Sequence, residues 1–182
     1  MLKGVLKGDT VIISDPEEAR QLYASAFYGK FIGLDKVKPE EAKNATAPLH
    51  LSILDAVYLV EQGRLAVTRS NGVPVSLDEL RKALELRFSD AATVYGIYKF
   101  FRDRGFVVKS GLKFGSLFAI YEKGPGIDHA PILIHYLDPA RNITALDITR
   151  AARLSHSVRK TFVLATRDID DLFFIGFEWW NP

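Results

Sequence analysis

The second half of the chain is dominated by short apolar segments with the length and composition of β-strands. After Gly105, runs rich in Val, Ile, Phe and Tyr recur, and turn-forming or charged residues separate them. One longer segment, 145–158, has the spacing of an amphipathic helix and lies between the third and fourth runs. Five strands and one helix in this order indicate an α+β unit around a largely antiparallel sheet. The expected strands are FVVKSG, SLFAIYEKG, APILIHYLD, TFVLATRD and DLFFIGFEWW.

The beginning of the chain mixes strands with helices. Residues 3–14 alternate and then run apolar, as short strands do. A helix is expected at about 16–26, behind a capping Asp15 or Ser14. An irregular segment or short strand is expected at 27–34.

A further amphipathic helix is expected from residue 49 in the stretch 49–67. Ser52 and Asp55 resemble a capping pair, and Gly63 ends this helix before a short strand. Two more helices, LDELRKALELRF and DAATVYGIYKFFRDR, lead into the strand-rich part. We therefore expect an α+β fold of two small domains. The bounds are 1–88 for an N-terminal α/β domain and 89–182 for a C-terminal domain with the mainly antiparallel sheet.

Residues 35–48 interrupt these patterns. The stretch DKVKPEEAKNATAP is polar, carries three lysines and two prolines, and shows no apolar stripe. Such a stretch is typical of an exposed loop. The alternative is a functional insertion that reaches a substrate, with Lys43 near its middle.

The composition of the chain excludes several classes of protein. The apolar fraction of 48% suits a globular chain with a core, and the absence of cysteine excludes disulfides and thiolate metal sites. Apolar runs are far shorter than a bilayer span, so we expect a soluble cytoplasmic protein with no membrane partner. The net charge of +2 is only weakly basic, but Lys and Arg gather at 98–113 and 150–160.

Three residue types in the second half suit acid–base chemistry on a phosphodiester. Tyr121 and His129 flank a Gly/Pro turn, and Lys160 follows the expected helix. RNA can be cut without a metal when its 2′-hydroxyl attacks the adjacent phosphorus. That reaction uses a base, an acid and a cation, for which histidine and lysine are well suited. A tyrosine, with an ordinary pKa of about 10, becomes a usable base when a nearby cation lowers that pKa.

Other readings of these residues remain open at this point. Each of the three has an ordinary structural role available, as a strand-end aromatic, a loop histidine or a solvated helix-end charge. His135 and His156 compete for the role of proton carrier, although His135 falls within an apolar strand. A metal-dependent nuclease would need clustered carboxylates, and Glu122 and Asp128 stand isolated.

Several longer motifs resemble the archaeal tRNA-splicing endonucleases of the catalytic-subunit type. The resemblance extends over almost the whole chain and implies a restriction-endonuclease-like catalytic domain. Its C-terminal motifs are RDRGFVVKSGLKFG, FAIYEKGPGIDHAPILIHY and AARLSHSVRKTFVLATRD, and its N-terminal ones are DPEEARQLYASAFYGKFIG and LSILDAVYLVEQGRL.

The resemblance implies a role for each residue of the trio. Tyr121 would be the general base on the 2′-hydroxyl, His129 the general acid toward the 5′ oxygen, and Lys160 the residue that stabilises the transition state. The products would be a 2′,3′-cyclic phosphate and a 5′-hydroxyl, with no metal and no cofactor. The implied substrate is precursor tRNA with a bulge–helix–bulge.

The resemblance also implies residues that hold the RNA. Arg153 occupies the position of an arginine that clamps a bulge base from the opposite subunit. The second arginine of that clamp is missing, and Trp179 stands in its region, while Trp180 is equally well an interface or core aromatic. Lys43, in an insertion similar to that of crenarchaeal heteromeric enzymes, would contact RNA.

Assembly into a tetramer is the last implication. An acidic loop of the family docks into a basic cleft on another subunit, and the last strand pairs across a two-fold axis. The tetramer would contain either four copies of this chain or, as the insertion favours, two copies plus two of a non-catalytic relative. The alternatives are a non-catalytic subunit of the same assembly and a general RNA-binding module. The interface residues are Asp168, Asp170 and Asp171.

Overall fold

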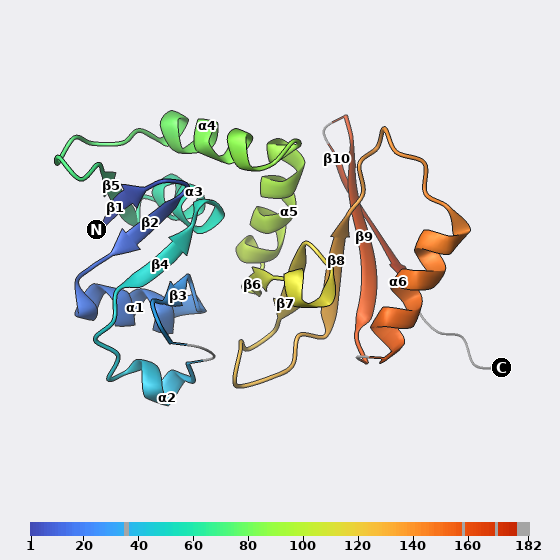
Figure 1. The fold of residues 1–182 in the computed structure, drawn as a ribbon, viewed down its shortest axis with the longest axis horizontal. Helices are drawn as coiled ribbons and strands as arrows, with labels where there is room; N and C mark the ends of the chain where they lie inside the picture. The colour runs from blue at the N-terminus through green and yellow to red at the C-terminus, as the bar shows by residue number, and fades with distance from the viewer. Residues whose placement is uncertain (35–36, 158, 170, 178–182) are drawn as a thin grey trace. The chain divides into compact units, whose positions relative to one another are not determined.

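The computed structural model describes residues 1–34, 37–157, 159–169 and 171–177 (Figure 1). Contacts divide the chain into two units. The first comprises Met1–Ala92 with Pro125–Ile127, and the second comprises Thr93–Gly124 with Asp128–Pro182. Each unit has a five-stranded sheet and helices, so the predicted α+β class is confirmed. The division at 88/89 stays a prediction of the sequence.

The sheet of the first unit has the order β3-β4-β2-β1-β5. The β1–β5 pair is parallel and the other pairs are antiparallel. Asp15 caps α1 by accepting hydrogen bonds from two backbone N–H groups, as the sequence predicts. The elements are β1 (Leu2–Lys7), β2 (Thr10–Ile13), α1 (Pro16–Ala26), β3 (Lys30–Phe31), α2 (Pro39–Ala42), β4 (Leu49–Ser52), α3 (Ile53–Glu61), β5 (Leu65–Thr68) and α4 (Leu77–Arg87).

The prediction of helix from residue 49 is wrong for the first four residues. Leu49 and Leu51 are fully buried, whereas His50 and Ser52 are exposed, which is the alternation of a strand. These residues form β4, which pairs with β2 and β3. Ser52 is both the last residue of β4 and the N-cap of α3, where it forms the predicted capping box with Asp55.

The polar stretch 35–48 is not a plain loop. Its described part contains the short helix α2, and Val37, Ala42 and Ala45 are buried. The Tyr23 hydroxyl donates a hydrogen bond to the Val37 carbonyl over 2.8 Å. Three small or branched apolar side chains therefore anchor the stretch, although its composition is mostly polar.

The sheet of the second unit has the order β10-β9-β8-β7-β6, with β8 and β9 parallel and the other pairs antiparallel. All five predicted strands and the predicted helix between the third and fourth are confirmed. The elements are α5 (Ala91–Asp103), β6 (Val107–Ser110), the 3₁₀ helix η1 (Leu112–Phe114), β7 (Phe118–Tyr121), β8 (Ile132–Tyr136), α6 (Ala145–Ser157), β9 (Thr161–Asp168) and β10 (Asp171–Phe177).

Helices α5 and α6 cover opposite faces of this sheet (Figure 1). Phe100 of α5 packs against Phe174, with ring centroids 4.7 Å apart. On the other face, Ile148 and Ala151 of α6 line a cavity together with Leu164 of β9. Phe174 and Leu164 lie at adjacent register positions, so their side chains point to opposite faces.

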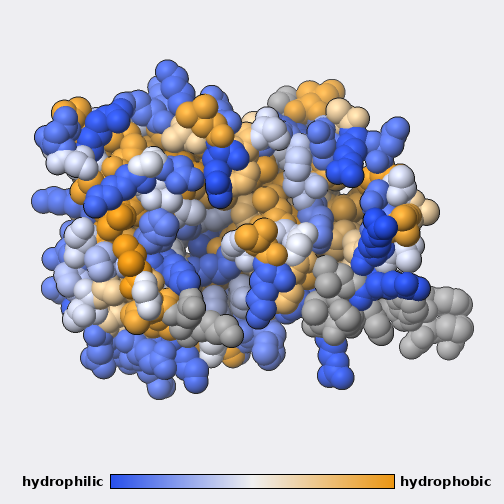
Figure 2. Space-filling model, in the orientation of Figure 1, coloured by the Kyte–Doolittle hydropathy of each residue, from blue (hydrophilic) through white to orange (hydrophobic). Residues whose placement is uncertain are grey.

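The surface combines hydrophilic and hydrophobic residues (Figure 2). Among the exposed apolar side chains are Phe173 and Ile175 of β10, which are 48% and 49% exposed. β10 ends the strand order of its sheet, so its outer edge has no strand partner within the described chain. An edge strand with exposed aromatic and aliphatic residues is a surface that proteins normally cover or pair.

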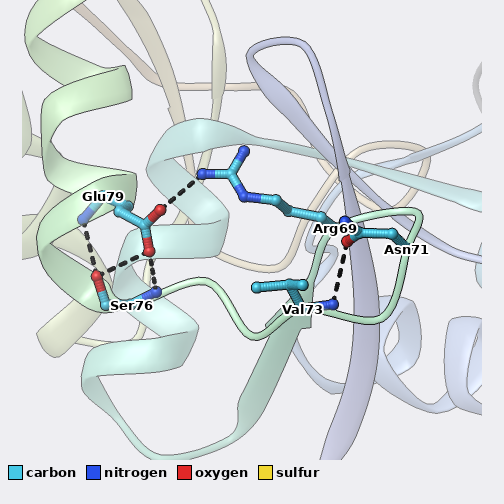
Figure 3. Close-up of polar contacts among 5 residues, drawn as sticks. All are labelled: Arg69, Asn71, Val73, Ser76 and Glu79. Atoms are coloured by element: carbon cyan, nitrogen blue, oxygen red, sulfur yellow. Dashed lines mark hydrogen bonds and ion pairs between the residues drawn. The ribbon is translucent and has the colours of Figure 1, made fainter.

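A polar cluster fixes the start of α4 (Figure 3). Ser76 accepts a hydrogen bond from the backbone N–H of Glu79, and the Glu79 carboxylate accepts one from the backbone N–H of Ser76. Arg69 donates to the same carboxylate over 2.6 Å. Hydrogen bonds from the Ser76 backbone, Arg69 and the Ser76 side chain lower the pKa of Glu79.

Ser76→Ala should lower the free energy of unfolding by about 1 kcal/mol, because it removes the N-cap acceptor. The measurement is chemical denaturation monitored by circular dichroism. Ser70→Ala, at an exposed turn position nearby, is the matched control and should change little. Equal loss in both variants would contradict the role of the cap.

Candidate active site

Three strand ends meet at one end of the second sheet. β7 runs antiparallel to β8, and β8 runs parallel to β9. The end of β7 and the starts of β8 and β9 therefore lie at the same end of the sheet. Tyr121 is the last residue of β7, His129 lies shortly before β8, and Lys160 immediately precedes β9. The topology thus brings together the three residues that the sequence singles out.

Lys160 is tied to the backbone beside His129. Its Nζ donates a hydrogen bond to the carbonyl oxygen of Ala130. The backbone N–H of Thr161 donates to the Pro131 carbonyl over 2.8 Å, which fixes the start of β9 against the same segment. Partial burial lowers the pKa of the Lys160 ammonium, because desolvation disfavours the charged form.

Tyr121 lies in an environment that keeps its phenol protonated. Burial raises the pKa of Tyr121, and the negative charge of Asp128 raises it further. The Asp128 carboxylate also accepts hydrogen bonds from the backbone N–H groups of Lys123 and Gly124, which close the turn after β7. A nearby cation would lower this pKa, which is what a role as general base calls for. In the free chain the nearby carboxylate has the opposite effect.

His129 and His135 differ in their surroundings. His129 is exposed in the loop before β8. His135 lies within β8 with its ring centroid 4.4 Å from that of Phe162, and its buried Nε2 has no hydrogen-bond partner among the residues that the structure describes. Burial lowers the pKa of His135. The side chain of His156, the third candidate, lies outside the described part of the chain.

His135 lines a cavity that is separate from the three strand ends. The cavity has a volume of about 490 Å³ and lies between α6 and the sheet. None of the three candidate catalytic residues lines it. Its polar side chains include His135, Asp138, Arg141, Asn142, Asp147 and Arg150.

Phe114 is a residue near the site that the sequence analysis missed. Its ring centroid lies 5.2 Å from the Lys160 Nζ. Phe114 and Tyr121 both pack against a buried cluster of Ala119, Ala130 and Leu133. The motif GLKFG contains this phenylalanine, but the contact with a lysine 46 positions later appears only once the chain is folded.

The remaining predicted residues lie at the surface or outside the described chain. Arg153 is exposed on α6, and Lys43 is exposed at the C-cap of α2. Asp168 and Asp171 are exposed and face each other as the last pair of the β9–β10 hairpin. Their contacts with RNA or other subunits stay predictions. Two of the predicted residues, Asp170 and Trp179, lie outside the described residues.

In the described ranges, no group of three His, Asp or Glu side chains is placed to hold a metal ion. Within those same ranges, no helix has the length and apolarity needed to cross a bilayer.

Fold and site together define a two-unit α+β protein with a tyrosine, a histidine and a lysine at one end of a mixed sheet. Comparison with family models gives two matches. The model of the tRNA intron endonuclease N-terminal domain matches residues 2–81, and that of the tRNA intron endonuclease catalytic C-terminal domain matches residues 91–172. The chain belongs to the tRNA intron endonuclease family and is an endonuclease.

Curated relatives agree with the family models. The chain is 51% identical to a tRNA-splicing endonuclease of Pyrobaculum islandicum over 98% of both chains. It is 43% identical to one of Hyperthermus butylicus over 100% of both chains, and 36% identical to one of Saccharolobus islandicus over 98% of both. The resemblance drawn from the sequence motifs is confirmed.

His135 should make the chain less stable in acid. Because burial lowers its pKa, the folded chain binds a proton there less readily than the unfolded chain. The free energy of unfolding should therefore fall as the pH drops below about 6.5, the ordinary histidine value. His135→Phe should flatten this dependence, measured by denaturation at several pH values. His50→Gln, at an exposed histidine of β4, should leave it unchanged.

Tyr121 should ionise above the ordinary tyrosine value of 10.0. The ionisation step of Tyr121 is obtained by subtracting the ultraviolet tyrosinate titration of Tyr121→Phe from that of the wild type. Asp128→Asn should move the step to lower pH, because it removes a negative charge beside the phenol, while burial still keeps the pKa raised. Circular dichroism at each pH confirms that the chain stays folded. An unmoved step would show that Asp128 does not act on the phenol.

Proposed function

We propose that this chain excises introns from precursor tRNA by cutting at bulge–helix–bulge motifs. The cut would leave a 2′,3′-cyclic phosphate and a 5′-hydroxyl and would need no metal ion. The observation that carries the proposal is that Tyr121, His129 and Lys160 lie at the same end of one sheet. The relatives are tRNA-splicing endonucleases by name, which supports precursor tRNA as the substrate.

Each of the three side chains would act at a different atom of the scissile unit. Tyr121 would take the proton from the attacking 2′-hydroxyl, and His129 would give a proton to the leaving 5′ oxygen. The Lys160 ammonium would stabilise the negative charge that grows on the non-bridging oxygens. The raised pKa of Tyr121 keeps phenolate rare at neutral pH, so its role as base would make cleavage faster as the pH rises.

Residues outside the catalytic trio would bind the RNA. Bulged bases are unstacked and can be held by arginine and aromatic planes. Arg153, exposed on α6, would hold one such base together with Trp179 of another subunit. Lys43, exposed beside α2, would contact the RNA backbone as a positive charge.

Assembly would create two such sites at a fixed separation. The exposed Asp168 and Asp171 at the β9–β10 hairpin, with Asp170 between them, would dock on another subunit. The exposed apolar residues of β10, Phe173 and Ile175, support pairing of this edge across a two-fold axis. We propose a cytoplasmic tetramer, either of four identical chains or of two copies with two of a non-catalytic relative.

The test is cleavage of a labelled bulge–helix–bulge RNA in excess EDTA, with product ends analysed. We expect cyclic-phosphate ends, and we expect His129→Ala to abolish cleavage while RNA affinity stays close to that of the wild type. His135→Phe is the matched control, since His135 lines a cavity that none of the trio lines, and this variant should cleave normally.

Other outcomes separate the alternatives. Cleavage that requires magnesium would overturn the metal-free mechanism, and tight binding without cleavage would favour a binding module. Cleavage only after a second subunit is added would support the heterotetramer, and cleavage by this chain alone would support the homotetramer.

A further inference from the structure

Phe114 lies between two features of the candidate site. The Lys160 Nζ lies 5.2 Å from the ring centroid, which is within the range of a cation–π contact. The ring also packs against Ala119, Ala130 and Leu133, the buried cluster against which Tyr121 packs as well. One aromatic ring is therefore in contact with the catalytic lysine and with the packing that supports the catalytic phenol.

The loop that presents Phe114 is held by hydrogen bonds and close backbone packing. The backbone N–H of Phe114 donates to the Gly111 carbonyl over 2.7 Å, and the buried Ser116 hydroxyl donates to the same oxygen over 3.1 Å. A Cβ at Gly111 would lie 2.8 Å from backbone atoms of Ser116 and Phe118, so only glycine fits there. The ring position is thus set by η1 and its hydrogen bonds.

The surroundings of the Phe114 ring favour its contact with the Lys160 ammonium group. Lys160 is partly desolvated, and a cation–π contact strengthens when the cation has lost part of its water. The hydrogen bond to the Ala130 carbonyl restrains Lys160 from a second direction. A second ammonium, that of the exposed Lys113, lies farther from the same ring centroid, at 5.9 Å.

We infer that Phe114 is a positioning residue, whose ring holds the Lys160 ammonium at a fixed place relative to Tyr121. This inference rests on the proposed function, since it concerns the residue assigned to stabilise the transition state. A lysine side chain has many rotamers, and it loses conformational entropy when it is held in one of them. The ring and the Ala130 carbonyl together restrict Lys160 before RNA binds, so that less of this entropy is lost during cleavage.

The test compares Phe114→Leu, which keeps an apolar side chain but removes the ring, with Phe114→Tyr, which keeps the ring. Under single-turnover conditions, Phe114→Leu should cleave about tenfold more slowly with unchanged RNA affinity, and Phe114→Tyr should stay close to the wild type. In a Lys160→Ala background, Phe114→Leu should have no further effect, because the ammonium that the ring holds is absent. Equal losses in both backgrounds would overturn the inference.

A second readout does not depend on cleavage. The Lys160 Cε protons, labelled with carbon-13 and assigned through Lys160→Ala, should show an upfield ring-current shift in the free protein. Phe114→Leu should remove this shift and Phe114→Tyr should retain it. If the wild type cuts no RNA, the proposed function fails, while this shift still decides whether Phe114 positions Lys160.

Phe100→Leu is the matched control, because it removes another phenylalanine ring that lies in a cation–π contact. The Arg104 guanidinium carbon lies 3.6 Å from the Phe100 ring centroid, on the side of the sheet covered by α5. We expect this variant to cleave as the wild type does. A tenfold loss there as well would show that the effect of Phe114→Leu is a general loss of packing.

Discussion

The candidate site depends on the parallel pairing of β8 with β9. Because Thr161 pairs with Ile132, Lys160 reaches the Ala130 carbonyl although 30 positions separate the two residues. Parallel neighbours cannot be joined by a tight turn, so the chain must cross over, and α6 is that crossover. The helix thereby returns the chain to the end of the sheet where β7 finishes, and it also carries the exposed Arg153.

The two faces of this sheet have different roles. On the α5 face, Phe100, Phe101 and Phe174 pack closely and give the unit an aromatic core. On the other face, the alternation of β7 places Tyr121 on the same side as Ala119, against which Phe114 packs. The aromatic core therefore lies on one face, and the charged and titratable groups of the candidate site lie at the end of the other.

Local patterns predicted most of the fold, because alternation and turn residues are local. The sequence alone does not define the start of α3, because LHLS continues the apolar spacing of the helix while it alternates as a strand. Motif resemblance predicts the trio but not the charges around it. Which charge lies nearer to Tyr121 depends on the folded turn, where burial and then Asp128 raise the pKa of Tyr121. The contact between Phe114 and Lys160 likewise arises from tertiary packing alone.

The junction at Ser52 has a consequence for how this chain can vary in length. Since one residue ends β4 and caps α3, no connecting residue exists that could absorb an insertion or deletion. Removing one residue before Ser52 would turn the buried Leu49 and Leu51 toward solvent. The same deletion would displace Ser52 from its position as the N-cap of α3. Length changes between homologues should therefore be excluded at this junction.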